Sequence, residues 1–223
     1  MILPDVRQAV RSNLDDMQYD ATKIDQAINW FQNELFNNTR TALMETSATL
    51  NLAQGASSVA LPTDLQVILD MTVTSPGSAY SINKNKLDST TFAQRYPDYT
   101  GYSQQAASEW AVYGRSLRFS APVSAATVIR LDYVRRPVPA TLNAPTLEAP
   151  DQYFELYVLG AQARIMEINE DFAEAAQIRG NLDPLVTTFI RNEARGGIIS
   201  GPTIMRSNRR RMGGRFGDPY GWF

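Results

Sequence analysis

The sequence predicts an α+β protein: a four-helix bundle with an inserted antiparallel β module and an extended C-terminal arm. Apolar residues recur with the period of a helix near both ends of the chain. Between those ends they alternate with the period of a strand. Neither pattern continues into the last segment, which glycine and proline interrupt repeatedly. The predicted domains are a helical bundle of residues 1–45 and 150–195, a β module of residues 46–149, and an arm of residues 196–223.

The first two helices are predicted over residues 3–18 and 22–43. Pro4 suits a first helical turn, where its missing N–H costs little, and Thr22 with Asp25 is interpreted as a capping pair. The short polar turn between these helices predicts a helical hairpin. Their apolar faces contain Leu3, Val6, Val10, Leu14 and Met17 in the first helix and Ile24, Ala27, Ile28, Phe31 and Leu35 in the second.

The middle of the chain predicts strands. A hairpin is expected over Trp110–Phe119, with Gly114 supplying the positive φ of a tight turn. Residues 89–96 are expected to form one short helical turn, which Pro97 stops. Most connections are too short for the crossovers that parallel strands require, so the sheet is predicted to be antiparallel. Further strands are predicted at residues 49–52, 59–61, 65–73 and 127–134.

Two more helices are predicted after a proline-rich connection. The third runs from Asp151, its expected cap, to Ile168, and the fourth covers residues 171–195. Pro184 is expected to kink or split the fourth helix, because proline removes a backbone N–H and clashes with the preceding turn. Five aromatic residues are interpreted as core: Trp30, Phe31, Phe36, Phe154 and Phe189. Two others are left as either core or sheet-face contacts: Trp110 and Tyr113.

The composition excludes several kinds of chemistry. The chain has no cysteine and no histidine, which removes disulfides, thiolate metal sites, the commonest zinc ligand and the usual partner of a nucleophilic serine. No phosphate loop, dinucleotide-binding glycine motif or hydrolase motif occurs. The neighbouring carboxylates of Asp15 and Asp16, and of Glu167, Glu170 and Asp171, are interpreted as solvated helix ends. We therefore predict no cofactor, no metal site and no enzymatic activity, with catalysis by carboxylates alone as the alternative left open.

The sequence carries no targeting or membrane signal. The opening residues Met1–Asp5 lack the charged and apolar regions of a secretory signal. No apolar run reaches the roughly 18 residues that a membrane-spanning helix requires. These features predict a soluble protein made in a cytoplasm, with no membrane partner.

The arm, residues 196–223, combines positive charge with large aromatic side chains. It holds five arginines and one acid, a net charge of +4, which leaves 16 basic and 22 acidic residues and a net charge of −6 on the body. Solvated segments are usually poor in aromatic residues, and an extended arm of this length spans up to roughly 90 Å. We predict that it docks on a partner. The predicted partner-binding residues are Arg206, Arg209, Arg210, Arg211, Arg215, Phe216, Tyr220, Trp222 and Phe223.

The arm chemistry leaves three alternatives open. Arginine makes bidentate hydrogen bonds to carboxylates and to phosphates, so an acidic protein surface and a nucleic acid both fit. The terminal aromatic rings favour a protein, because buried aromatic and arginine side chains dominate protein interfaces, although such rings also stack on bases. A solvated tail without a partner is the third alternative.

Several stretches of the chain resemble one family. They are Asp20–Trp30, Ala60–Leu65, Leu117–Pro122, Ile129–Tyr133 and the closing helix pair. In this order they resemble the head–tail adaptor proteins of tailed bacteriophages, also called head-completion or tail tubular proteins, over about residues 3–195. The resemblance implies a non-enzymatic virion protein at the head–tail junction. In that family twelve copies form a ring beneath the portal, prolong the channel for double-stranded DNA and present a platform to the tail.

The resemblance also implies the partners: the portal protein, a tail or nozzle protein, further copies of the chain, and DNA passing through the channel. The C-terminal arm of the family commonly docks on the portal, but residues 196–223 contain no stretch that matches, so their roles rest on chemistry alone. Phe36 and Tyr153 fall off the apolar stripes and are expected to contact an adjacent copy or the β module. Exposed edge strands are a further expected contact between copies. The alternative function is a small nucleic-acid-binding protein that uses the arginine-rich arm.

Overall fold

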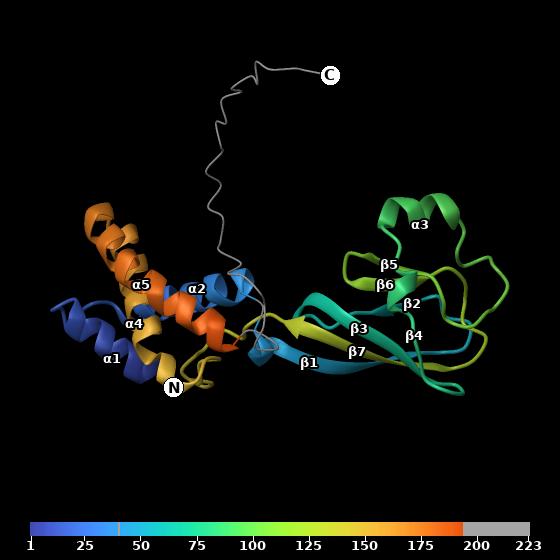
Figure 1. Ribbon diagram of the computed structural model, residues 1–223, viewed down its shortest axis with the longest axis horizontal. Coiled ribbons are helices and arrows are strands. Elements are labelled where there is room, and N and C mark those ends of the chain that lie inside the picture. The colour runs from blue at the N-terminus through green and yellow to red at the C-terminus, as the bar shows by residue number, and fades with distance from the viewer. Residues whose placement is uncertain (40, 194–223) are drawn as a thin grey trace, which may run out of the picture.

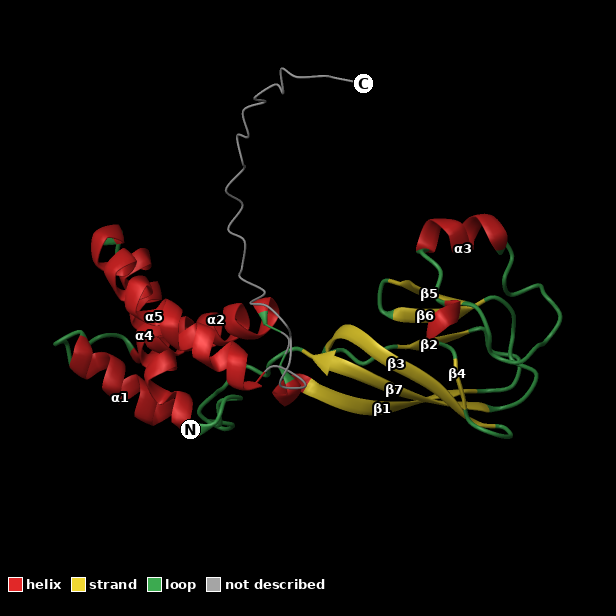
Figure 2. Ribbon diagram, viewed as in Figure 1, coloured by secondary structure: helices red, strands yellow, loops and turns green. Residues whose placement is uncertain are grey.

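The protein is an α+β molecule with its helices at one end and its strands at the other (Figure 1). The computed structural model describes residues 1–39 and 41–193. Colouring by secondary structure separates the two parts clearly, with the short helix α3 (Ser89–Arg95) and the 3₁₀ turn Asn83–Asn85 among the strands (Figure 2). The predicted fold class and the antiparallel pairing are confirmed. The finer description, a four-helix bundle with an inserted module and the domain boundaries given above, stays a prediction.

Helix α4 (Phe154–Ile168) lies at the centre of the helical part, because it packs against three other helices. Most of its side chains are buried, including Tyr157 and Ile165. Gly160 allows α2 to approach closely, since a Cβ at that position would lie 2.4 Å from the ring of Phe31. The three helices around α4 are α1 (Leu3–Asn13), α2 (Ala21–Asn38) and α5 (Phe172–Glu193).

The ends of the first two helices differ from the prediction. Helix α1 ends at Asn13, and Asp15 in the following turn has a positive φ of 51°. The cap of α2 is Asp20, whose carboxylate accepts a hydrogen bond from the Thr22 N–H at 2.8 Å. The predicted cap partner, Asp25, instead accepts two hydrogen bonds from Arg7 at 2.8 and 2.6 Å. The predicted capping pair is therefore wrong, because a long-range ion pair takes the Asp25 carboxylate.

The second helix pair also departs from the prediction at specific residues. Asp151 does not cap α4: it starts a 3₁₀ turn (Asp151–Tyr153), and no side chain caps the helix itself. Helix α5 continues through Pro184, so the expected split does not occur. Two hydroxyls in the turn after the proline, those of Thr187 and Thr188, donate hydrogen bonds of 2.9 Å to backbone carbonyls one turn earlier.

The strands form two antiparallel sheets. In the first sheet the order is β1-β7-β3-β4, and in the second it is β2-β6-β5. β7 lies inside the first sheet. It pairs with β1 in a register that places Glu45 opposite Val134 at one end and Leu52 opposite Thr127 at the other. The predicted hairpin is confirmed as β5 and β6, with Gly114 at a φ of 57° in its turn. The strands are β1 (Glu45–Leu52), β2 (Ser58–Ala60), β3 (Leu65–Ser75), β4 (Tyr80–Ser81), β5 (Trp110–Tyr113), β6 (Ser116–Phe119) and β7 (Thr127–Arg135).

Each part has its own hydrophobic core. The helical core contains Phe36 and Phe189, whose rings meet edge to face at 5.7 Å. The strand core contains Trp110, which is buried and donates its indole N–H to the Ile82 carbonyl at 2.7 Å. Trp110 is therefore a core residue, the first of the two alternatives left open for it.

A buried polar network connects the two parts. The side chain of Gln32 on α2 donates to the Val138 carbonyl at 2.9 Å and accepts from the Tyr157 hydroxyl at 3.0 Å and the Glu148 N–H at 3.1 Å. Glu148 in turn binds Arg135, at the end of β7, through two hydrogen bonds of 2.7 Å. The segment that follows β7 is thus fixed to both α2 and α4 by hydrogen bonds.

Candidate interaction surfaces

The predicted partner-binding residues lie outside the described residues. The described chain ends at Glu193, whereas the predicted site comprises Arg206, Arg209, Arg210, Arg211, Arg215, Phe216, Tyr220, Trp222 and Phe223. The structure therefore neither brings these residues together nor separates them. The surfaces below belong to the described part of the chain. Of these, the sequence predicted contacts only at the strand edges and at Phe36 and Tyr153.

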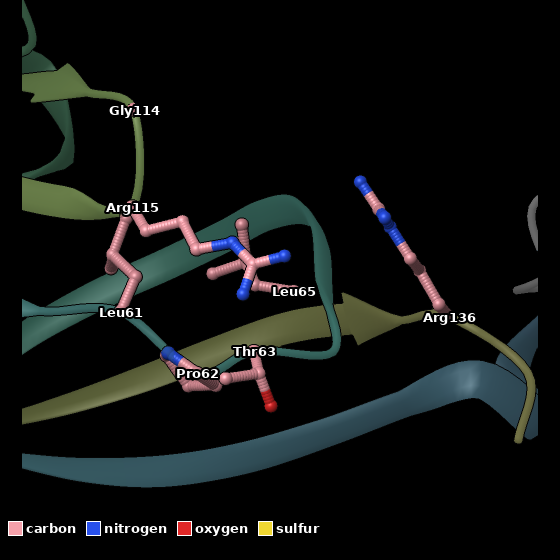
Figure 3. A pocket seen from close by; sticks show the side chains of 7 residues that line it. All are labelled: Leu61, Pro62, Thr63, Leu65, Gly114, Arg115 and Arg136. Atoms are coloured by element: carbon pink, nitrogen blue, oxygen red, sulfur yellow. The ribbon is translucent and has the colours of Figure 1, made fainter.

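A shallow pocket of about 100 Å³ lies where both sheets approach the helical part. Three segments form it: the loop between β2 and β3, the turn of the β5–β6 hairpin, and the residue after β7 (Figure 3). Two arginines line it: the Arg115 side chain extends sideways from the hairpin turn, and the Arg136 side chain rises from the segment after β7 (Figure 3). The remaining lining residues are Leu61, Pro62, Thr63, Leu65 and Gly114.

The positive charge of this pocket is not neutralised by the described chain. Arg115 and Arg136 are exposed, and neither forms an ion pair with a described carboxylate. The acid of the β2–β3 loop, Asp64, accepts a hydrogen bond from the Tyr133 hydroxyl at 3.0 Å. Burial, together with this hydrogen bond to Asp64, raises the pKa of Tyr133. The pocket thus presents two guanidinium groups to solvent, beside a carboxylate that already has a partner.

Other arginines in the strand part already have a carboxylate or an aromatic ring as partner. Arg135 binds Glu148, which raises the pKa of the guanidinium. Arg130 pairs with Asp132 at 3.0 Å on the exposed face of β7. Arg115 and Arg136 differ from these residues in having no such partner among the described residues, and this difference makes the pocket a candidate site for an external anion.

A tyrosine cluster, formed by Tyr96, Tyr99, Tyr102 and Tyr113 around Phe92 of α3, lies in the strand part. The buried ring of Phe92 lies 5.4 Å from Tyr96, 6.0 Å from Tyr99 and 5.9 Å from Tyr113. Arg118 lies over the Tyr113 ring, with 4.3 Å between the guanidinium carbon and the ring centroid. Tyr113 is therefore a half-buried sheet-face residue, the second of the two alternatives left open for it.

The outer edge of the tyrosine cluster is exposed. Tyr102 packs edge to face on Tyr96 and is 42% exposed. The hydroxyl of Tyr96 donates to Glu109, which raises the tyrosine pKa, and Glu109 also accepts from Arg95 at 2.9 Å. Tyrosine and arginine are among the residues most enriched in energetically important interface contacts. The cluster is a second candidate surface for a protein partner.

The helical surface corrects two sets of predictions. Trp30 is 38% exposed and Phe154 is 36% exposed, so neither is a core residue as predicted. The Trp30 ring is covered on one side by Arg164, whose guanidinium carbon lies 4.0 Å from the ring centroid. Phe36 and Tyr153, predicted to contact another copy or the β module, are buried against Phe189 of α5. The predicted contacts with another copy or the β module are wrong, because α5 covers both rings within the same chain. The interpretation of Phe31, Phe36 and Phe189 as core residues is confirmed.

The strand edges are partly protected. β1 lies at one edge of the first sheet, and the two-residue strand β4 covers only part of the other. Beyond β4, the side chain of Asn83 accepts from the Met71 N–H at 2.9 Å and donates to the Leu69 carbonyl at 3.3 Å. The expectation that an edge strand pairs with another copy stays a prediction.

The acidic groups singled out in the sequence lie at helix ends. Burial raises the pKa of Glu167, but hydrogen bonds from Arg164 at 2.9 Å and from Arg179 at 2.6 Å outweigh it, and the net pKa is lowered. Asp15 is exposed in the turn after α1. Within residues 1–39 and 41–193, no three acidic side chains are arranged to hold a metal ion. None of the helices in this part of the chain has the length and hydrophobicity needed to cross a bilayer.

The comparison with known families identifies the class of protein. The sequence model of a family described as SU10 adaptor protein matches residues 1–201, which is most of the chain. The chain therefore belongs to this family of phage head–tail adaptors. A search of curated proteins found no match.

Family membership indicates a structural virion protein at the head–tail junction that interacts with portal and tail components. The resemblance is confirmed at this level. The match ends at residue 201, before every predicted partner-binding residue, the first of which is Arg206. The roles of those residues consequently rest on their chemistry and are not carried over from the family.

Proposed function

We propose that the protein forms a ring of twelve copies that joins the portal to the tail or nozzle and prolongs the channel through which double-stranded DNA passes. The observation that carries this proposal is the family match over residues 1–201. A ring requires that one surface of each copy binds a different surface of the next, so that rotation closes the assembly. The unpaired arginines of the pocket and the excess of acidic residues in the body support this proposal, because opposite charges on two copies attract.

The arm is proposed to dock this ring on the portal. Its net charge of +4 suits an acidic groove, and the aromatic residues at its end suit apolar pockets beside that groove. A segment that becomes ordered only on its partner makes docking conditional on the portal being present. The proposed contacts are Arg206, Arg209, Arg210, Arg211, Arg215, Phe216, Tyr220, Trp222 and Phe223.

The proposed mechanism is assembly without catalysis. The absence of histidine and cysteine from the sequence supports this proposal, because it removes the commonest general base and the commonest thiol nucleophile. The pairing of Glu167 with two arginines supports it further, since a carboxylate held ionised in this way is a poor general acid.

Portal co-sedimentation tests the docking arm. A chain that ends at residue 199 is mixed with isolated portal rings beside the full chain, and the bound fraction is measured in each. We expect the shortened chain to lose binding. Equal binding of the two chains would rule out the arm as the docking element.

Two matched variants separate the contributions of the arm. Replacement of Arg209, Arg210 and Arg211 by alanine removes charge, and replacement of Trp222 and Phe223 by alanine removes apolar contacts. If the partner is a protein, we expect both variants to bind portal rings more weakly. The loss of binding caused by the aromatic variant should depend less on salt than the loss caused by the arginine variant. If the full chain shifts DNA in gels with a steep salt dependence and ignores portal rings, the alternative nucleic-acid-binding function is correct.

A further inference from the structure

The two-arginine pocket has the size and charge for a single small anionic group. Arg115 and Arg136 come from different segments, and the fold alone brings them to one opening (Figure 3). A volume of about 100 Å³ accommodates one carboxylate with its terminal carbons. Arginine recognises a carboxylate through two parallel N–H···O hydrogen bonds, so two arginines satisfy all the acceptor positions of one such group.

The surroundings of the pocket favour a carboxylate over the phosphates of a nucleic acid. Binding along a nucleic acid needs a stripe of basic residues that neutralises several phosphates. The arginines nearest in the sequence do not extend the pocket into a stripe, because Arg135 is bound to Glu148 and Arg118 is stacked on tyrosine rings. The body as a whole carries a net charge of −6, which repels a polyanion.

A second copy of the chain supplies suitable carboxylates. Exposed acids without an ion-pair partner among the described residues are found on the surface of α4, α5 and the turn between them: Glu155, Glu170, Glu174 and Asp183. The pocket and these acids lie on different parts of the molecule, so a contact between them joins unlike surfaces of two copies. Such a contact is the kind that closes a ring by rotation.

We infer that the pocket of Arg115 and Arg136 is a contact between copies, and that it receives an exposed carboxylate of the α4–α5 surface of the adjacent copy. This inference rests on the proposed ring. It assigns to the pocket a role that the family match does not give to any residue. It also places one contact between copies outside the arm, so that the arm is free to bind the portal.

Carboxylate–amine coupling tests the contact directly. The variants Arg115→Lys and Arg136→Lys keep the charge and introduce an amine that a carbodiimide couples to a touching carboxylate. Isotopically heavy and light copies of each variant are mixed, assembled on portal rings, coupled and digested. We expect coupled peptides that join the introduced lysine of one copy to an α4–α5 acid of a copy of the other isotope.

The chain offers two controls for this coupling. Arg130→Lys is another exposed replacement whose partner, Asp132, lies in the same copy, so its coupling is expected only within one isotope. The native residues Lys84 and Lys86 are exposed and report the level of random coupling. Coupling of the introduced pocket lysines at or below this level in assembled rings overturns the inference, as does their coupling to portal or tail peptides.

A charge reversal provides an independent measurement. The double variant Arg115→Glu and Arg136→Glu changes exposed side chains and should leave the unfolding midpoint nearly unchanged. We expect it to need an at least about fivefold higher concentration for half-maximal ring formation in sedimentation velocity. If the wild-type chain forms no ring with portal rings, the proposed function fails with the inference. If rings form equally well with the double variant and without coupling, only the inference fails.

Discussion

The helical and strand parts of this adaptor both bury aromatic rings, but they expose aromatic rings in different settings. In the helical part the buried ring of Phe189 meets the rings of Phe36 and Tyr153 edge to face. In the strand part Tyr102 is exposed at the edge of an aromatic cluster. The exposed rings of the helical part, Trp30 and Phe154, lie outside this buried group, whereas the exposed ring of Tyr102 continues an aromatic cluster that begins at the buried Phe92.

The two parts also differ in the exposed charges that they carry. The exposed acids Glu170, Glu174 and Asp183 lie on the helical surface, whereas the unpaired arginines Arg115 and Arg136 lie in the pocket beside the sheets. One chain thus carries a group of acids on its helical surface and a local basic site beside its sheets. Contacts between copies are therefore expected between the helical surface of one copy and the pocket of the next, since a ring brings unlike surfaces together.

The largest expected effect on stability comes from removing a large buried side chain from either core. Phe189→Ala and Trp110→Ala each remove a buried aromatic side chain, which costs about 3–5 kcal/mol of unfolding free energy. Urea unfolding measures the loss, and hydrogen exchange shows where protection is lost. If the cores are separate, Phe189→Ala exposes the helices first and Trp110→Ala exposes the strands first. Uniform loss of protection in both variants would show that the two parts unfold as one unit.

The network between the parts predicts a dependence of stability on pH. Burial raises the pKa of Glu148, but hydrogen bonds from Arg135 and from the Val138 N–H outweigh it, and the net pKa is lowered. A carboxyl group with a lowered pKa stabilises the fold above its unfolded pKa, and this contribution is lost as the pH falls through the folded pKa. Stability should therefore fall below about pH 4.5, the ordinary pKa of glutamate.

The variant Glu148→Gln isolates this contribution. It should cost about 1.5–3 kcal/mol at pH 7, the usual value of hydrogen bonds to a charged group, and less at pH 3. Thermal unfolding across this pH range measures both effects. Glu167→Gln is the control within the helical part, since Glu167 also has a lowered pKa but its arginine partners lie outside the network. An equal loss at pH 7 and pH 3 for Glu148→Gln would contradict the role of the charge.

Two glycines test how tightly the helices pack. Gly160→Ala places a Cβ against the ring of Phe31 and should cost about 1–3 kcal/mol by overpacking. Gly180→Ala is the matched control on α5, because a Cβ there meets nothing within 4 Å. It should stabilise the protein by about 0.5–1 kcal/mol through helix propensity. Chemical unfolding measures both, and the same sign for the two variants would contradict the packing of α2 on α4.

The sequence predicted the elements whose signals are local. The hairpin at Gly114 and the strand Thr127–Arg135 follow from turn chemistry and alternation within a few residues. Capping at Asp20 was missed because Thr22, two residues later, is also a favourable cap residue. The sequence does not show that its expected partner, Asp25, is bound by the distant Arg7. Trp30 was taken as core because the sequence does not show that Arg164 covers it instead.

The candidate site was less predictable than the fold. Arg115 follows a turn glycine and Arg136 follows a strand, and neither position is unusual by itself. They become one site only through the pairing of β2 with β6 and of β3 with β7, contacts that join segments far apart in the sequence. The arginines of the arm were found from composition alone, because in residues 196–223 charge and aromatic content need no fold to be recognised.

The smallest expected effect concerns the tyrosine cluster. Arg118→Ala removes the guanidinium that stacks on Tyr113 and should cost about 0.5–1 kcal/mol. Tyr102→Ala should change stability by less than about 0.5 kcal/mol, because the ring is exposed. If the cluster is an interface, Tyr102→Ala weakens binding to a tail protein in pull-down assays despite this small effect. A tail protein bound equally well by this variant would remove Tyr102 from the proposed surface.

The most direct test of the proposed docking is a cryo-electron microscopy map of the head–tail junction that includes this chain. We expect a ring of copies beneath the portal, with Arg206–Arg215 and the aromatic residues up to Phe223 lying against the portal protein. A map in which Trp222 and Phe223 pack into the core of their own copy, or contact nothing in the completed particle, would contradict it.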